Sequence, residues 1–256
     1  MNKVLITGVS SGVGRELAKD LSLKSYFVIG VARRKNLLEG LKKELPKSAN
    51  FNYITADLAN ENAWERIIVV LKKKKYIPDV VIFNAATWEK KLVTEFSYES
   101  LERMHKVNFL SVMKGLSLLM SYCGKKETQF IAISTLSALW GSPEEGVGYP
   151  ASKAALSITF EGLYQKFKNT NFIFTTISLG PIKANTNAFR IFQPFQISNE
   201  SVVLLIRKGI IEKKPAYYSP KLLFFCFGFL RLLPLKLKLW TFSFINGLHP
   251  YHLNKK

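Results

Sequence analysis

Short apolar runs alternate with amphipathic segments through most of the chain. The runs are rich in β-branched residues and lie at 4–6, 26–32, 51–55, 79–83, 130–134 and 172–178. Between them the pattern predicts helices that end near residue 23 and that span 35–45, 63–75, 97–122 and 149–169. Runs that are apolar on both faces are typical of parallel strands buried between helices. The alternation therefore predicts an α/β fold, with a doubly wound parallel sheet flanked by helices.

The pattern changes after residue 178. Residues 183–198 are polar and then aromatic, 201–208 are predicted to form a helix, and 213–245 mix large apolar side chains with Lys and Arg. We therefore expect one domain over 1–198 and a basic, hydrophobic helical extension over 199–256. The longest apolar run, 222–235, is interrupted by Arg231 and Pro234. A bilayer span needs about 20 apolar residues, so we expect no transmembrane helix.

The charge of the chain is strongly basic and unevenly distributed. Lys and Arg number 37 against 18 Asp and Glu, which gives a net charge of +19, and no acidic residue follows Lys213. Such an excess indicates an anionic partner. In the extension the aromatic residues lie among Leu and Phe, which favours an interfacial helix pair on an anionic membrane over 213–245 rather than a nucleic-acid site. An oligomer contact, or a helix docked on the core, is the alternative.

Cysteine content and the start of the sequence bear on the compartment. Two Cys in 256 residues exclude a disulfide framework and indicate reducing surroundings. The first apolar run is too short for a signal peptide. We expect a cytoplasmic protein, with peripheral membrane association as an option.

A glycine-rich turn follows the first predicted strand and opens the first helix. Residues 7–14 read TGVSSGVG. Glycines allow a tight turn and close approach to a ligand, and the exposed N–H groups of a helix start favour a pyrophosphate. Because the turn lies between a strand and a helix, we predict a Rossmann-like dinucleotide site, although a tight connection alone would also use glycine.

The end of the second strand bears on which dinucleotide is bound. NAD sites commonly place an acidic residue there for the ribose hydroxyls. This chain has Arg33 and Arg34 instead. Guanidinium groups suit a 2′-phosphate, so we predict NADP(H), with Arg15 as a further candidate cation. A solvated charge run before a helix is the alternative.

A Tyr and a Lys stand four residues apart at the start of a later helix. Tyr149 and Lys153 therefore lie on one helix face. A nearby ammonium group stabilises a phenolate and lowers the Tyr pKa from about 10. Such a phenol is a usable acid or base near neutral pH.

These motifs together resemble the short-chain dehydrogenase/reductase family over roughly residues 1–185. The matching segments follow the family order: TGVSSGVG at 7–14, Asp57-Leu58, Asn84-Ala85-Ala86, Asn108, a hydroxyl cluster at 134–137, and Tyr149-x-x-x-Lys153. The resemblance implies that Tyr149 is the general acid or base, that Lys153 binds the nicotinamide ribose, and that Asn108 holds a water of the proton relay. It implies no metal.

The resemblance also implies which residues contact the cofactor. Asp57 would hold the adenine amino group, the segment after the fourth strand would form the cofactor floor, and Thr186 would reach the carboxamide. The full cofactor set is Gly8, Ser10, Ser11, Gly12, Val13, Gly14, Arg33, Arg34, Asp57, Leu58, Asn84, Ala85, Ala86, Tyr149, Lys153, Gly180 and Ile182.

The catalytic hydroxyl departs from the family pattern. The family's Ser is usually the second of a Ser-Ser pair, and here Thr135 occupies that position. Thr135 can donate the same hydrogen bond to a substrate carbonyl. Ser134 and Ser137 are alternatives that the sequence does not separate. The family's floor glycine is also replaced, by Ala86.

The expected activity is NADP(H)-dependent interconversion of a carbonyl and a secondary alcohol on a small-molecule substrate. An aromatic lid over 183–198 and a membrane-prone extension indicate a hydrophobic or lipid-linked substrate. The resemblance implies a homo-oligomer, and we expect no nucleic-acid partner. Two alternatives stay open: a catalytically weak regulatory or scaffold protein of the same fold, and a membrane-tethered interaction protein.

Overall fold

The core of the protein is a buried parallel sheet. The computed structural model describes residues 2–88, 97–140, 147–183 and 194–245, with side chains up to residue 241. Within these residues seven strands pair, all in parallel, in the order β3-β2-β1-β4-β5-β6-β7. The strands are β1 (Lys3–Thr7), β2 (Phe27–Ala32), β3 (Phe51–Thr55), β4 (Val80–Phe83), β5 (Thr128–Thr135), β6 (Phe172–Leu179) and β7 (Ala216–Ser219). The predicted doubly wound α/β fold is confirmed.

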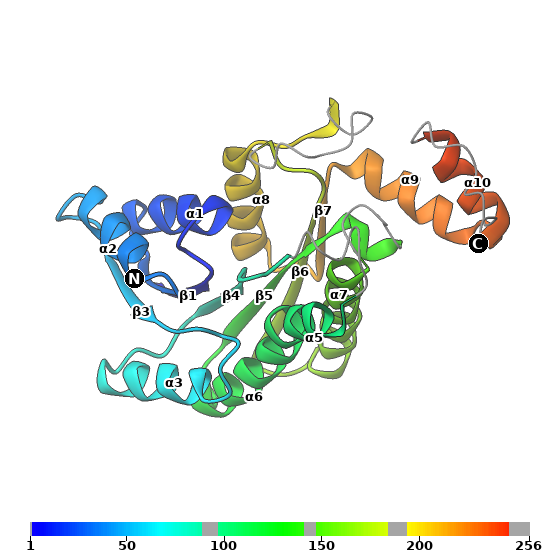
Figure 1. The fold of residues 1–256 in the computed structure, drawn as a ribbon. Helices are drawn as coiled ribbons and strands as arrows, with labels where there is room; N and C mark the ends of the chain where they lie inside the picture. The colour runs from blue at the N-terminus through cyan, green and yellow to red at the C-terminus, as the bar shows by residue number, and fades with distance from the viewer. Residues whose placement is uncertain (1, 89–96, 141–146, 184–193, 246–256) are drawn as a thin grey trace.

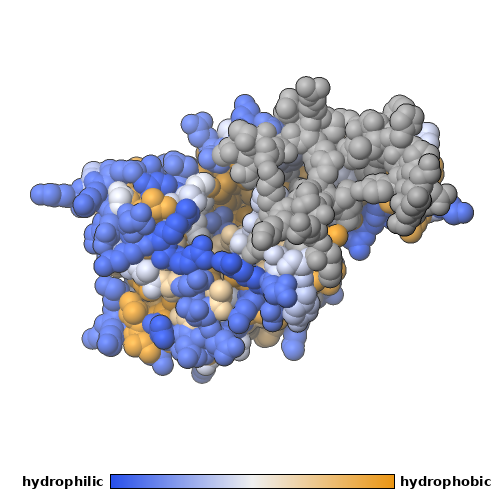
Figure 2. Space-filling view, viewed as in Figure 1, coloured by the Kyte–Doolittle hydropathy of each residue, from blue (hydrophilic) through white to orange (hydrophobic). Residues whose placement is uncertain are grey.

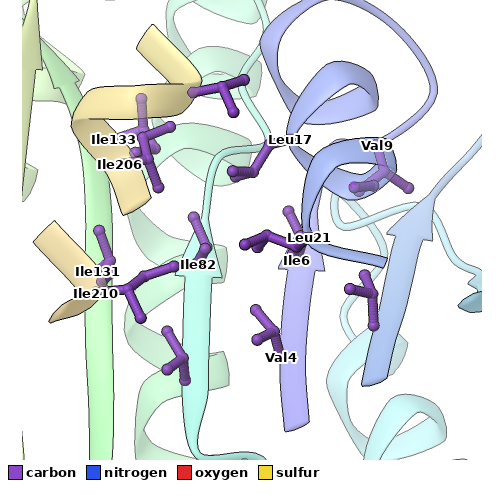
Figure 3. Packing of buried hydrophobic residues seen from close by; sticks show 14 of the residues in the cluster. Val4, Ile6, Val9, Leu17, Leu21, Ile82, Ile131, Ile133, Ile206 and Ile210 are labelled. Carbon is purple, nitrogen blue, oxygen red and sulfur yellow. The ribbon is translucent and has the colours of Figure 1, made fainter. Parts of the chain in front are cut away.

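Helices cover both faces of the sheet (Figure 1). One face carries α1 (Gly12–Leu23), α2 (Lys35–Glu44) and α8 (Asn199–Glu212). The other carries α3 (Ala63–Lys73), α6 (Ser111–Cys123) and α7 (Gly148–Lys166). Each face has its own hydrophobic core. In the first core, residues of α1 and α8 pack over β1, β4 and β5, as Figure 3 shows for Leu17, Leu21, Ile206, Ile210, Val4, Ile6, Ile82, Ile131 and Ile133.

The helix predicted over 97–122 is helical throughout but not regular. It consists of α5 (Tyr98–His105), a π-helical turn η1 (Lys106–Leu110) and α6. The Ser97 hydroxyl accepts a hydrogen bond from the Ser100 N–H and so caps the start of α5. The π turn, which periodicity alone does not reveal, contains the predicted site residue Asn108.

The sheet extends beyond the domain boundary that we expected at residue 198. Helix α8 contributes Val202, Ile206 and Ile210 to the core, and β7 pairs with β6 as the seventh strand. Lys213 is ion-paired with Glu127 at 2.6 Å. Residues 199–219 therefore belong to the sheet domain, and the extension begins after them. Within 213–245, the segment expected to face a membrane, residues 216–219 form the edge strand of the sheet instead.

Two helices complete the described chain. They are α9 (Lys221–Leu232) and α10 (Leu235–Ile245), and they project from the end of the sheet near β7 (Figure 1). The inner side of α9 packs on the short 3-10 helix η2 (Leu136–Leu139), which follows β5. Among the described residues, no helix combines the length and the apolar composition needed to cross a bilayer.

Candidate active site

A pocket of about 480 Å³ opens at the carboxyl ends of β1, β2 and β4. β1 pairs with β2 on one side and with β4 on the other, so the strand order reverses here. This switch point is where open α/β sheets bind their ligands. The predicted residues that line the pocket are Gly8, Ser10, Ser11, Gly12, Val13, Gly14, Arg33, Arg34, Asp57, Leu58, Asn84, Ala85, Ala86 and Ile182.

The glycines of the turn serve two different purposes. A Cβ at Gly14 would lie 2.3 Å from the Gly8 carbonyl oxygen and 2.4 Å from Asn84 Nδ2, so this glycine allows the first turn of α1 to pack against the preceding loop. Gly12 has a φ of +57° with no atom within 4 Å of its Cβ position. Gly12 therefore provides an open left-handed turn at the pocket wall. The Ser11 N-cap makes no side-chain capping bond, which leaves the first amides of α1 for a ligand.

The ends of β1 and β4 are joined by side-chain hydrogen bonds. The Thr7 hydroxyl accepts from the N–H groups of Asn84 and Ala85 at 3.1 and 3.0 Å. Asn84 Nδ2 donates to the carbonyl oxygens of Thr7 and Gly8 at 3.1 and 3.2 Å. Asn84 therefore holds the glycine turn in place at the wall of the pocket.

The two arginines after β2 have different partners. Arg34 donates from one guanidinium nitrogen to the hydroxyls of Ser10 and Ser11, at 2.8 and 2.9 Å. Arg33 lies 3.6 Å from the Asp57 carboxylate and is more than half exposed. Arg15, expected as a third cation for the cofactor, is instead paired with Glu44 and donates to the Leu37 carbonyl oxygen. The cationic side chains on the pocket wall beside the turn are therefore Arg33 and Arg34.

Lys153 is a buried amine on α7. Its side chain is 2% exposed, and Nζ donates to the Ile133 carbonyl oxygen at 2.7 Å. Burial lowers the pKa of Lys153 to about 8, because desolvation disfavours the ammonium form. Tyr149 is half-buried in the first turn of the same helix. The predicted Tyr-Lys pair is therefore carried by one rigid element beside β5.

The three candidate hydroxyls after β5 lie in two environments. The Ser134 hydroxyl is buried and contacts α7, at 2.7 Å from Ser157 Oγ and 3.3 Å from the Lys153 carbonyl oxygen. Thr135 Oγ1 lies 2.9 Å from Ser137 Oγ and accepts from the Ser137 N–H. Ser134 thus attaches the helix to the strand, whereas Thr135 and Ser137 form a pair at the start of η2.

Asn108 is fully buried in the π turn. Its Oδ1 accepts from the Thr87 N–H at 2.7 Å, and its Nδ2 donates to the Thr87 carbonyl oxygen and to Ser152 Oγ. The side chain therefore links the segment after β4 to α7. The water-binding role implied by the family resemblance stays a prediction.

Some predicted residues lie elsewhere, and some lining residues were not predicted. Gly180 packs against Pro220 and donates its N–H to the Ser219 carbonyl oxygen, away from the pocket lining. Thr186 and most of the predicted lid over 183–198 lie outside the described residues. The lining residues missing from our prediction are Val31, Ala32, Ala56, Ala59, Thr87, Arg103, Val107 and Asn199. Several directly follow strands or flank predicted residues, and that position was the available signal.

Comparison with known proteins agrees with this geometry. The family model described as short chain dehydrogenase matches residues 2–191. The NADPH-dependent pterin aldehyde reductase of Arabidopsis thaliana is 32% identical over 161 residues, which cover 62% of this chain and 65% of that protein. A hydroxysteroid 11-beta-dehydrogenase 1-like protein of Xenopus tropicalis is 24% identical over 224 residues, or 84% of this chain and 78% of that protein.

Solved structures share the fold at low identity. A 4-hydroxyisoleucine dehydrogenase complexed with NADH has a TM-score of 0.77 at 21% identity and covers 86% of this chain and 97% of its own. A short-chain dehydrogenase from Sphingobium yanoikuyae in complex with NADPH has a TM-score of 0.75 at 19% identity. The match covers 86% of this chain and 88% of that one. The glycine turn, Asp57 and Asn84 line the pocket, whereas the predicted cofactor residues Tyr149 and Lys153 lie outside its lining. Because the family model spans most of the sequence, this chain belongs to the short-chain dehydrogenase/reductase family of oxidoreductases.

Proposed function

We propose that the protein is an NADP(H)-dependent oxidoreductase that interconverts a carbonyl group and a secondary alcohol. The observation that carries the cofactor preference is the cationic end of the pocket. β2 ends at Ala32 without a carboxylate, and Arg33 and Arg34 follow on the pocket wall. Arg34 is held by the hydroxyls of Ser10 and Ser11, which orients its guanidinium group beside the glycine turn. An oriented guanidinium group suits a 2′-phosphate.

The remaining cofactor contacts follow from the lining of the pocket. The N-terminal amides of α1 suit the pyrophosphate, and Leu58 and Val107 offer apolar surface to the adenine ring. The bound nicotinamide would supply or accept the hydride. A pocket of about 480 Å³ with glycines at its wall is compatible with a dinucleotide.

The proton chemistry is assigned to the chain's own side chains. Tyr149 holds the transferred proton at its phenol oxygen, and the ammonium form of Lys153, on the same helix face, favours the phenolate. The Thr135–Ser137 hydroxyl pair is the better candidate to hydrogen-bond the substrate oxygen, because the Ser134 hydroxyl is already engaged with α7.

The substrate in this proposal is hydrophobic or lipid-linked. An apolar cluster begins at Leu136, the residue that follows Thr135. Its members include Leu136, Leu139, Trp140 and Phe227. A peripheral membrane location and a homo-oligomeric state belong to the same proposal. Leu110 in η1 and Ile158 in α7 are more than half exposed, which favours a contact between copies of the chain on this side.

The cofactor preference is tested by Arg34→Ala. We expect the Kd for NADPH to rise about 10-fold or more, since a charge-assisted hydrogen bond is lost, with a much smaller rise for NADH. Lys35→Ala is the matched control, because Lys35 is the next cation and is paired with Glu39 on the α2 surface. Equal losses for both cofactors in Arg34→Ala would refute the 2′-phosphate role.

The chemistry is tested by Tyr149→Phe. We expect the oxidation of NADPH with a panel of aldehydes and ketones to fall at least about 100-fold, as for loss of a general acid, while NADPH still binds. Retained turnover would refute the assignment of Tyr149. If wild type binds NADPH but turns over no member of an apolar carbonyl panel, the regulatory or scaffold alternative replaces the enzyme proposal.

A further inference from the structure

The helices α9 and α10 expose a large amount of apolar surface. On α9, Phe225 is 67% exposed, Phe229 65% and Leu232 83%. On α10, Leu235 is 67% and Trp240 62% exposed. Both apolar and hydrophilic side chains are visible on this arm in Figure 2. Exposed apolar side chains gathered on one arm indicate an interaction surface rather than ordinary scatter.

The inner side of α9 is already in use. Leu223 and Phe227 are buried against Leu136, and the Phe227 ring stacks on Trp140 with ring centroids 4.7 Å apart. The outer residues Phe225 and Phe229 point away from this contact, as their exposure shows. One side of α9 is thus fixed to the protein, and the other is left for a partner.

The charge of the arm identifies the class of partner. Residues 221–245 contain four cations, Lys221, Arg231, Lys236 and Lys238, and no acidic residue. Lys236 and Lys238 alternate with Leu at the start of α10. Apolar side chains with interspersed Lys and Arg suit the interface of a leaflet that contains anionic lipid. A symmetric contact with a second copy would bring two acid-free, cationic arms together, which electrostatic repulsion disfavours.

We infer that the α9–α10 arm is a one-sided membrane anchor, which inserts its outer apolar side chains into an anionic leaflet. The inner side of α9 contacts η2, so the anchored protein would hold the Thr135–Ser137 hydroxyl pair beside the lipid surface. This part of the inference rests on the proposed function: a hydrophobic substrate dissolved in the leaflet would reach the site without crossing water. The binding of lipid itself does not depend on it.

Vesicle co-sedimentation of the full chain tests the anchor. The probes are phosphatidylcholine vesicles with and without phosphatidylserine. We expect binding to the anionic vesicles and little to the neutral ones. The double variant Phe225→Ser/Phe229→Ser should lose about 10-fold or more in affinity, since it removes two large apolar side chains. Lys236→Glu/Lys238→Glu should lose on the order of 10-fold, and added salt should weaken wild type similarly.

A matched control is available on α8. Leu204 and Ile211 are 60% and 69% exposed but lie on the sheet domain, so Leu204→Ser/Ile211→Ser should bind vesicles as wild type does. Equal losses in this control and in the arm variant would overturn the inference. So would binding to neutral vesicles as strong as to anionic ones. A wild-type dimer that dissociates in the arm variant, without vesicle binding by either, would assign the arm to a second copy instead.

Measuring NADPH affinity in the same samples separates this inference from the proposed function. The arm variants should bind NADPH as wild type does, because no arm residue lines the cofactor pocket described above. Vesicle binding without any NADPH binding would leave the anchor standing and refute the cofactor proposal. NADPH binding without vesicle binding would refute the anchor alone.

Discussion

The buried amine of Lys153 should make the stability of the protein depend on pH above neutrality. Lys153→Met is the informative change, since it keeps most of the side-chain stem and removes the titrating group. The pKa of Lys153 is about 8 in the folded chain against 10.5 for the ordinary side chain. Between these values the unfolded chain holds the extra proton, so the free energy of unfolding of wild type rises with pH.

The size of the effect follows from the shift. Each pKa unit corresponds to about 1.4 kcal/mol. Because the side chain is 2% exposed, solvent screening does not reduce the value much. Over the accessible range from pH 7 to 10, wild type should gain between about 2 and 3 kcal/mol relative to Lys153→Met. Below pH 7 the difference between the two proteins should be constant, because Lys153 is then protonated in both states.

Urea unfolding of both proteins at a series of pH values measures this difference. Groups distant from Lys153 that titrate in the range, including tyrosines whose pKa is raised by burial such as Tyr218, are shared by the two proteins and cancel. Making the comparison in a Tyr149→Phe background removes the phenol that is coupled to Lys153. A wild-type-minus-variant difference that stays flat from pH 7 to 10 would refute the reasoning. It would mean that water or a structural rearrangement keeps the buried amine charged.

Two further predictions concern the turn and the hydroxyls. Gly14→Ala should lower the free energy of unfolding by about 1–3 kcal/mol and weaken NADPH binding, because its methyl group would collide with the Gly8 carbonyl oxygen and the Asn84 amide. Thermal denaturation measures the stability, and NADPH titration measures the binding. Wild-type values in both measurements would contradict the packing role. Ser134→Ala should lower the free energy of unfolding by about 1 kcal/mol, and its kcat should fall only a few-fold. Thr135→Val should lower kcat more strongly. Steady-state kinetics that rank the two variants in the opposite order would reassign the catalytic hydroxyl.

The alternating strands and helices of the sheet domain could be predicted from the sequence alone. Most strands between residues 4 and 178 are apolar, β-branched runs, and burial on both faces makes such runs easy to recognise; the edge strand β3, FNYIT, is only partly buried. The glycine turn and the residues that directly follow strands were also predictable, because parallel strands place their carboxyl ends together. This positional rule located most of the lining of the pocket, including Asp57 and Asn84.

The missing parts depend on contacts that local pattern does not encode. β7 has four residues, AYYS, and its strand character comes from pairing with β6 rather than from its composition. The charge pattern places Lys213 in the run predicted to face a membrane, but its ammonium group is paired with Glu127, which is distant in the sequence. Likewise the three hydroxyls at 134–137 are equivalent in sequence, and only the packing of α7 separates Ser134 from the other two.

The π-helical turn η1 has a consequence for the angular phase of the helices around it. A π turn accommodates one residue more than regular helical spacing, and one residue corresponds to about 100° of rotation about the helix axis. The extra residue lets α5 direct Arg103 to the pocket while α6 turns Leu116 toward the sheet. With a regular helix the two segments could not both keep these directions. The π turn therefore sets the rotation of α5 relative to α6, so that Arg103 lines the pocket and Leu116 packs in the core.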